Sequence, residues 1–239
     1  MLSRKIDKRK SYVMVIDVET CGERKNPLVY DIGIAIIDKK GNIYDKFSFI
    51  ISEIFDNEEL MSSAYYKRKI PQYLTNIDKG LSQKVEFLEM RSIFLELLRV
   101  YRVETISAYN LRFDMRALTS TTEYLFGQGK KFLSSTYKDI NLLCIWSFAC
   151  EVLYSRPSFL NFVNDHDYLT KTDNPKTTVE IGYRYITNDT SFVEKHMGLD
   201  DVVAESQILA KCYIQHKRHE SGIIGSPWRI VSKYKKSME

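Results

Sequence analysis

The segment Tyr12-Val13-Met14-Val15-Ile16-Asp17-Val18-Glu19-Thr20 decides the fold. Its first five residues are apolar on both faces and partly β-branched, which is typical of a central strand buried on both sides. Asp17 and Glu19 follow that run at positions i and i+2. Side chains two residues apart on a strand project to the same side, so the two carboxylates converge. The segment therefore predicts a core strand with an acidic pair at its end.

A mixed sheet is predicted around this strand. The apolar run 32–37 leads into the hairpin-turn sequence Lys39-Lys40-Gly41-Asn42, and residues 43–51 keep a period of two, so three strands form an antiparallel meander. A helical section follows, which opens with the capping-box pair Asp56 and Glu59 and closes at Pro71. The next elements are an amphipathic helix over 84–101, a strand over 105–108 and a helix after Asn110. The last predicted elements are a strand and a helix within 138–154, a small ribbon over 179–186 and a final helix over 201–218. This order predicts an α/β fold in which helices flank the sheet.

The composition indicates a globular chain without a membrane span. Of 239 residues, 44% are hydrophobic and 28% are charged, and the formal net charge is +4. That charge permits a polyanionic partner without requiring one. The longest apolar stretches fall far short of the roughly 18–20 residues that a bilayer needs. The four cysteines show neither C-x-x-C pairing nor zinc-ligand spacing, so we expect reduced thiols and a cytoplasmic location.

One domain is expected, because the sequence has no internal repeat and no Gly/Ser linker. We divide the chain into a basic leader (1–11), a domain (12–220) with a polar, enlarged excursion at about 150–195, and a basic C-terminal tail (221–239) that we expect to be loosely held. The leader lacks the apolar region of a secretory signal.

The acidic pair Asp17 and Glu19 is the first candidate site. Two like charges placed together are unfavourable unless a cation or a proton offsets their repulsion, and a hard divalent metal with oxygen ligands is the usual solution. The spacing alone also fits acids of a surface loop, since Asp56 and Glu58 show it in a polar region. The buried strand that precedes Asp17 favours the metal site.

Two further segments carry residues of the same kind. Asp114 lies in the first turn of a predicted helix, where a carboxylate also suits the helix dipole. His196 stands just before the acidic start of the last helix, at Asp201. Each residue taken alone has a structural interpretation. Together, four carboxylates and a histidine are the components of two-metal phosphodiester hydrolysis, in which a neutral histidine accepts a proton from the attacking water.

The set Asp17-x-Glu19-Thr20, Asn110-x-x-Phe113-Asp114 and His196-x-x-x-x-Asp201 resembles the DEDDh branch of the DnaQ-like 3′–5′ exonucleases, which have a ribonuclease H-like fold. The resemblance covers roughly residues 12–218. Residues 61–73 and 180–205 further resemble exonucleases encoded by bacteriophages, which would place the protein in the host cytoplasm.

This resemblance implies a role for each matching residue. Asp17 would bridge two Mg²⁺ or Mn²⁺ ions, Glu19 and Asp201 would complete the shell of the first ion, and Asp114 would hold the second. The other implied roles are those of His196 as general base, Thr20 and Asn110 as contacts of the terminal nucleotide, and Phe113 as a packing residue there or in the core.

The expected function is 3′–5′ exonuclease activity on DNA, single strands favoured, with release of nucleoside 5′-monophosphates. Two alternatives stay open at the level of sequence. One is an RNA exonuclease of the same fold, because contacts to the 2′-hydroxyl distinguish the two substrates. The other is a non-catalytic nucleic-acid-binding module associated with a polymerase or replisome. The segment Tyr65-Tyr66-Lys67-Arg68-Lys69 combines aromatic rings with positive charge and fits either a single-strand path or a solvated helix end.

Overall fold

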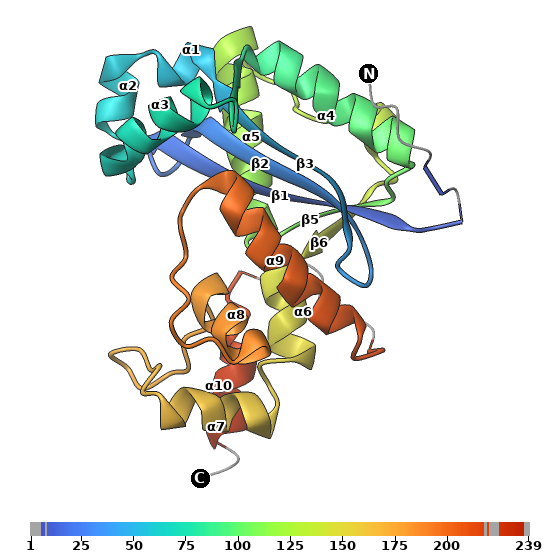
Figure 1. Ribbon diagram of the computed structural model, residues 1–239, viewed down its shortest axis with the longest axis vertical. Helices are drawn as coiled ribbons and strands as arrows, with labels where there is room; N and C mark the ends of the chain where they lie inside the picture. Colours follow the sequence, from blue (N-terminus) through green and yellow to red (C-terminus); the bar gives the residue numbers. More distant parts are fainter. Residues whose placement is uncertain (1–5, 8, 218, 220–224, 237–239) are drawn as a thin grey trace.

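A six-stranded mixed sheet forms the centre of the molecule (Figure 1). The computed structural model describes residues 6–7, 9–217, 219 and 225–236, so parts of the predicted leader and tail lie outside the described residues. The strand order is β4-β3-β2-β1-β5-β6, with antiparallel pairing from β1 to β3 and parallel pairing of β4, β5 and β6 with their neighbours. The strands are β1 (Tyr12–Gly22), β2 (Pro27–Asp38), β3 (Ile43–Ile51), β4 (Gln83–Val85), β5 (Thr105–Ala108) and β6 (Asn141–Cys144).

Helices cover both faces of this sheet (Figure 1). One face packs against the helices of the first half of the chain, which are α1 (Ser52–Phe55), α2 (Glu58–Ser62), α3 (Ile70–Asp78), α4 (Phe87–Tyr101) and α5 (Leu111–Phe126), with the 3₁₀ turn η1 (Lys67–Lys69). On the other face, α6 (Ile145–Val152) and α9 (Gly198–Tyr213) pack against the strands. Further from the sheet, α8 (Val179–Thr187) packs on α9, α10 (Trp228–Lys236) packs on α6, and α7 (Pro157–Asp165) contributes to the same core. A second 3₁₀ turn, η2 (Ser135–Tyr137), precedes β6.

Alternate side chains of β1 point to opposite faces of the sheet and so contribute to both hydrophobic cores. Met14 and Ile16 belong to the core under α4 and α5, whereas Val13 and Val15 belong to the core under α6 and α9. The predicted meander and the parallel strands beyond it are confirmed. Strand β1 extends further than predicted, through Gly22, so the acidic pair lies within the strand rather than after it.

The β2–β3 hairpin turn forms where the sequence predicts it. Gly41 has a φ of 84°, a left-handed conformation that glycine adopts at little cost. The carboxylate of Asp38 accepts hydrogen bonds from the backbone N–H groups of Lys40 and Asn42 and from the hydroxyl of Tyr44 at 2.8–3.1 Å. The side chain of Asp38 therefore fixes the turn.

Two predictions around the first helical section are wrong in position. Pro71 does not close a helix but lies in the first turn of α3, where its fixed φ is compatible with a helix start. The cap of α2 is Asn57, whose side chain accepts a hydrogen bond from the backbone N–H of Leu60, instead of Asp56. Asp56 forms an ion pair with Lys84 at 2.9 Å instead.

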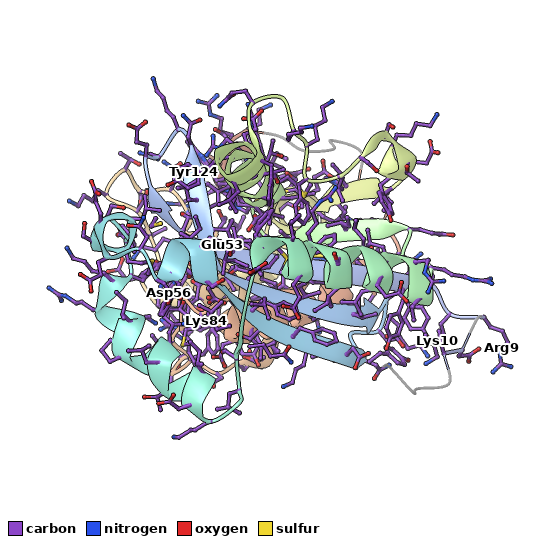
Figure 2. All side chains as sticks on the ribbon, turned by 90° about the horizontal axis from the view of Figure 1, so that it is seen from above. Arg9, Lys10, Glu53, Asp56, Lys84 and Tyr124 are labelled. Atoms are coloured by element: carbon purple, nitrogen blue, oxygen red, sulfur yellow. The ribbon has the colours of Figure 1, made fainter. Side chains whose placement is uncertain are left out.

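The predicted helix over 84–101 begins later, at Phe87, because residues 83–85 form β4 beside β3. The carboxylate of Glu53 accepts a hydrogen bond from the backbone N–H of Phe87 at 3.0 Å and so caps α4 from outside. Figure 2 labels Glu53 at this junction. A distant residue thus sets the helix start, and the local sequence pattern does not show it.

The predicted ribbon over 179–186 is wrong, because this segment is helix α8. The side chain of Thr178 caps this helix by accepting a hydrogen bond from the backbone N–H of Ile181. Glu180 and Arg184 form an ion pair at 3.0 Å across one turn. The boundary that the sequence left open within 138–154 falls between Cys144 and Ile145.

The last helix of the domain, α9, spans Gly198–Tyr213 instead of the predicted 201–218. Part of the predicted tail is also structured, since α10 packs against α6 and buries Val231 completely. No helix in the described part of the chain is long and apolar enough to cross a membrane. All four cysteines are buried free thiols, as predicted.

Candidate active site

The acidic pair continues one face of β1. Val13 and Val15 on that face are buried under α6 and α9, and Asp17 and Glu19 follow at the same period of two. Their cross-strand partners on β2 are Gly33 and Asp31, respectively. A register shift between Glu19 and Thr20 then interrupts the pairing of β1 with β2. The two carboxylates therefore face the helix that covers this part of the sheet, which is α9.

Two glycines let α9 approach the sheet closely. A Cβ atom on Gly33 would lie 2.0 Å from the carbonyl oxygen of Gly198, and a Cβ on Gly198 would lie 3.1 Å from the carbonyl oxygen of Asp17. Only two residues without side chains fit there. The backbone N–H of Gly198 donates a hydrogen bond to Asp31 at 2.9 Å, and the hydroxyl of Tyr73 donates to the same oxygen. The start of α9 is thus fixed above the Asp17–Gly33 pair.

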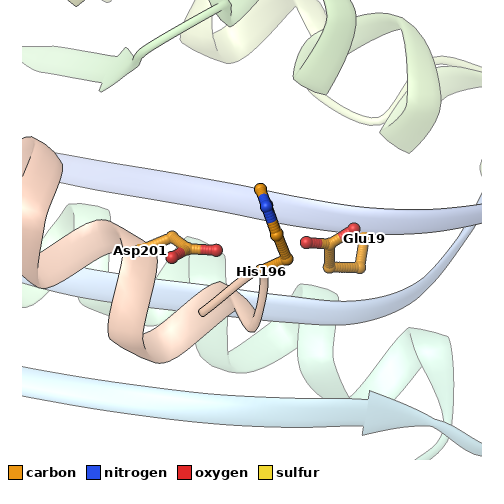
Figure 3. A group of neighbouring side chains, drawn as sticks. All are labelled: Glu19, His196 and Asp201. Carbon is orange, nitrogen blue, oxygen red and sulfur yellow. The ribbon is translucent and has the colours of Figure 1, made fainter. Parts of the chain in front are cut away.

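This contact brings Asp201 and His196 to the acidic pair. Asp201 is only 3% exposed, and its carboxylate accepts a hydrogen bond from the backbone N–H of Met197 at 2.8 Å. One ligand atom from each of Glu19, His196 and Asp201 lies within 4.8 Å of the other two. Figure 3 shows these three side chains meeting between β1 and the start of α9. The neighbouring acid, Asp200, instead forms an ion pair with Lys195 at 2.8 Å.

His196 is held by an aromatic stack. Its backbone has a φ of 49°, and its ring lies parallel to that of Tyr66, with centroids 4.3 Å apart and an interplanar angle of 11°. Burial and the charge of Lys69 lower the pKa of His196 below its usual range. The imidazole is therefore neutral at neutral pH and able to accept a proton.

The fourth predicted acid reaches the same place from α5. Asp114 is 2% exposed at the start of that helix, one turn after Asn110. Asp114 lines the same pocket as Asp17, Glu19, His196 and Asp201. This pocket has a volume of about 360 Å³, and we call it the acidic pocket. The other residues that line it are Val18, Tyr66, Tyr109, Asn110, Phe113, Trp146, Thr177, Thr178, Val179, Glu194 and Glu205. Asn110 and Phe113 are therefore among the residues that line the acidic pocket, whereas Thr20 is not.

Sequence reasoning missed two carboxylates of the pocket. Glu205 lies four residues after Asp201, on the same face of α9, and is 2% exposed. Its carboxylate accepts a hydrogen bond from the backbone N–H of Tyr109 at 3.1 Å, which ties α9 to the end of β5. Glu194 comes from the loop before α9. Helical spacing from Asp201 was a signal for Glu205, whereas no local pattern marked Glu194.

The carboxylates of the pocket perturb one another. Burial, followed by the charges of Glu205 and Asp114, raises the pKa of Asp17 well above its usual range. Burial, followed by the nearby Asp31, raises the pKa of Glu19 to about 9. Burial likewise raises the pKa values of Asp114 and Asp201 to about 7. Without a cation, the buried cluster therefore tends to retain protons.

The donor set fits a divalent cation. Six carboxylates line the acidic pocket, and none of the described residues that line it is lysine or arginine. Oxygen ligands of this kind suit Mg²⁺ and Mn²⁺, and a cation would offset the mutual repulsion that raises the pKa values. Aromatic rings, including those of Phe113 and Trp146, also line the pocket. The arrangement therefore combines cation ligands, a neutral base and a surface for a flat, apolar group.

No family model and no curated protein matches this sequence. Several solved structures share its fold. They include a zinc-bound complex of E. coli exonuclease I with single-stranded DNA (TM-score 0.52, 15% identity, 82% of this chain and 39% of that chain covered). Another is E. coli exonuclease I with a dA16 oligonucleotide (TM-score 0.53, 14% identity, 84% and 41% covered). A third is a moderately thermophilic exonuclease I from Methylocaldum szegediense (TM-score 0.54, 14% identity, 87% and 41% covered).

The chain spans about two fifths of the length of these proteins. At such low identity, the likeness concerns the fold. This chain shares with exonuclease I a mixed sheet flanked by helices, which the sequence predicts and which has six strands here.

Proposed function

We propose that this protein is a metal-dependent 3′–5′ exonuclease that hydrolyses single-stranded DNA and releases nucleoside 5′-monophosphates. The observation that carries the proposal is the convergence of Asp17, Glu19, Asp114, Asp201 and His196 in one open pocket from three separate segments of the chain. The fold shared with exonuclease I supports it, since structures of that enzyme hold single-stranded DNA. We favour DNA over RNA for the same reason.

Two Mg²⁺ or Mn²⁺ ions are the proposed cofactors. Asp17 is the proposed shared ligand, because its carboxyl group is affected by the charges of Glu205 and Asp201 of α9 and by that of Asp114 of α5. Glu19 and Asp201 complete one site, and Asp114 belongs to the other. Such ions stabilise the charge that develops on the attacking and leaving oxygens of a phosphodiester.

The other residues act on the water and the nucleotide. His196 accepts the proton of the attacking water, a role that its neutral imidazole permits. Tyr66 holds the imidazole in place through the ring stack. Asn110 and Phe113, at the N-terminus of α5, contact the terminal nucleotide in the acidic pocket. Thr20 remains a predicted contact of the same nucleotide.

The proposal is tested by the hydrolysis of 5′-labelled and 3′-labelled single-stranded DNA and RNA in Mg²⁺ or EDTA. The decisive pair of variants is Asp201→Asn and Asp200→Asn, two adjacent acids of which only the first lines the pocket. We expect Asp201→Asn to lower turnover by about 10²-fold or more and Asp200→Asn to leave it near the wild-type value. A wild-type protein that hydrolyses neither substrate in Mg²⁺ would refute the enzyme assignment. Equal losses in the two variants would refute the site.

The role of His196 needs its own measurement. We expect His196→Ala to lower turnover by about 10²–10⁴-fold, the usual effect of removing a general base. Mn²⁺ affinity, measured by titration calorimetry, should stay close to that of the wild type, because the carboxylates remain. A large loss of Mn²⁺ affinity would make His196 a ligand instead of a base.

A further inference from the structure

A second pocket adjoins the acidic pocket and shares Trp146, Thr177 and Thr178 with it. Its volume is about 290 Å³, and Trp228 of α10 lines it together with the loop 170–176. We call it the tryptophan pocket. The chain contains two tryptophans, and both line this pocket. In Figure 1, α10 lies with α7 and α8, away from the α1–α3 segment that follows β3.

Hydrogen bonds and packing hold Trp228 in place. The hydroxyl of Ser232 donates to the side-chain oxygen of Asn174 at 2.8 Å, and Lys235 forms an ion pair with Asp173 at 2.7 Å. Val231, three residues after Trp228, is fully buried. Helix α10 is therefore fixed on the loop that forms one wall of the pocket, and Trp228 is a defined part of that wall.

Trp146 is equally well oriented. Its indole N–H donates a hydrogen bond to the hydroxyl of Thr177 at 2.9 Å. Its ring lies nearly parallel to that of Tyr109 at a centroid distance of 6.3 Å. Trp146 is only partly buried, and it forms the boundary at which the two pockets meet. An extended molecule that leaves the acidic pocket past Trp146 reaches Trp228.

The two pockets differ in charge. Six carboxylates line the acidic pocket, whereas the described lining of the tryptophan pocket contains no acid and includes the exposed Lys176. The guanidinium of Arg229 lies over the ring of Trp228 at 5.6 Å. A polyanion with flat, apolar groups suits this combination, because bases stack on aromatic rings and phosphates attract the cations.

We propose that the tryptophan pocket binds unpaired nucleotides of the substrate strand on the 5′ side of the nucleotide held in the acidic pocket. Bases stack on Trp228 and Trp146, while Lys176 and Arg229 lie near the phosphates. This inference rests on the proposed function, because it takes the acidic pocket as the place of the 3′ end. It assigns to α10, at the C-terminal end of the described chain, a part in holding the strand.

Tryptophan fluorescence measures this binding directly. The probe is a series of oligothymidylates of 2 to 12 nucleotides, titrated in Mg²⁺. Their last two 3′ linkages, or the single linkage of the dinucleotide, are phosphorothioates that resist hydrolysis. We expect the 12-mer to quench the fluorescence more strongly than the dinucleotide, because the dinucleotide in the acidic pocket reaches Trp146 but not Trp228. Trp228→Ala should weaken binding of the 12-mer by about fivefold or more, the loss of one base stack, and Trp228→Phe should recover most of it. Tyr234→Ala, a change of an exposed aromatic residue on the same helix, is the matched control.

Hydrolysis of the corresponding unmodified oligonucleotides separates this inference from the proposed function. We expect Trp228→Ala to lower kcat/KM for the 12-mer and to leave that for the dinucleotide unchanged. If the wild type hydrolyses DNA and Trp228→Ala matches it at every length in both assays, the tryptophan pocket is refuted while the nuclease stands. If the wild type hydrolyses nothing but Trp228→Ala still weakens 12-mer binding, the nuclease is refuted while strand binding stands.

Discussion

The close approach of α9 to β2 makes Gly33→Ala the most informative single substitution. Gly33 lies opposite Asp17 in the β1–β2 register, and the Cβ atom of an alanine there would lie 2.0 Å from the carbonyl oxygen of Gly198 and 2.5 Å from the backbone nitrogen of Leu199. Both of these atoms are backbone, so no side-chain rotation relieves the clash. The start of α9 must move away from the sheet, and Asp201, three residues further on, moves with it.

The expected displacement of α9 in Gly33→Ala follows from how far the Cβ···O separation of 2.0 Å falls short of a normal contact. Non-bonded carbon and oxygen atoms in packed interiors rarely approach closer than about 3 Å, so the helix start must retreat by roughly 1 Å. Overpacking of this kind costs about 1–3 kcal/mol, which for a chain of this size lowers Tm by about 2 to 12 °C. A displacement of about 1 Å at a catalytic group lowers the rate by about 10²-fold. We therefore expect a loss of turnover that corresponds to about 2.7 kcal/mol of activation free energy, together with a loss of stability of similar size.

Three measurements on Gly33→Ala check this reasoning: Tm in EDTA, Mn²⁺ affinity by titration calorimetry, and hydrolysis of single-stranded DNA. Gly80→Ala is the control, because Gly80 requires a left-handed backbone but a Cβ atom there would have no neighbour within 4 Å. The Gly80→Ala variant should have a free energy of unfolding about 1–2 kcal/mol below that of the wild type and should keep the wild-type Mn²⁺ affinity. Gly198→Ala has a milder clash, so its losses of Mn²⁺ affinity and turnover should lie between those of Gly33→Ala and the wild type. Wild-type Mn²⁺ affinity and turnover in Gly33→Ala would refute the argument.

Three further predictions concern single residues. Burial raises the pKa of Asp38, but the hydrogen bonds of its turn outweigh that effect and lower the pKa to about 2. The Asp38→Asn variant should therefore be about 2 kcal/mol less stable than the wild type at pH 7. Urea unfolding should show this difference shrink as the pH falls from about 5 towards 2, and a constant difference would contradict the assignment. Tyr66→Ala should lower kcat by about 2- to 10-fold at unchanged Mn²⁺ affinity because the stack on His196 is lost, and Tyr66→Phe should restore it; failure of this rescue would refute the role of the ring. Glu205→Ala should cost about 1–3 kcal/mol in chemical denaturation because the buried N–H of Tyr109 loses its acceptor, and Glu205→Gln should recover most of that loss; equal losses in both variants would mean that the hydrogen bond contributes little.

The sequence was informative wherever local spacing determines geometry. The period of two in β1 predicts that Asp17 and Glu19 share a face, and the structure adds that Val13 and Val15 precede them on it. The adjacent acids Asp200 and Asp201 differ by one helical position, which turns one towards solvent and the other into the pocket. The assignment of catalytic roles to these residues stays a prediction, as does the likeness of segments 61–73 and 180–205 to phage enzymes.

Features that depend on distant partners were not predictable from local patterns. Residues 179–186 were predicted as a ribbon, yet they form helix α8, in which Gly182 packs closely against Tyr154 from a distant part of the chain. The stack of Tyr66 on His196 joins residues 130 positions apart, and the contact of Gly33 with Gly198 joins residues 165 positions apart. Spacing along the chain contains no information about such pairs.

Contacts outside the acidic triad Asp17, Glu19 and Asp201 fix the positions of its charges. Bringing Asp17, Glu19 and Asp201 together is unfavourable in the absence of a cation, as their raised pKa values indicate. The contact of Gly33 with Gly198 and the hydrogen bond from Gly198 to Asp31 involve no group of that triad, yet they fix its geometry. A bound cation would then offset repulsion within a preformed site instead of assembling the site. Metal binding should accordingly raise the stability of the protein while changing its backbone little, which distinguishes a preorganised centre from one that folds around its ions.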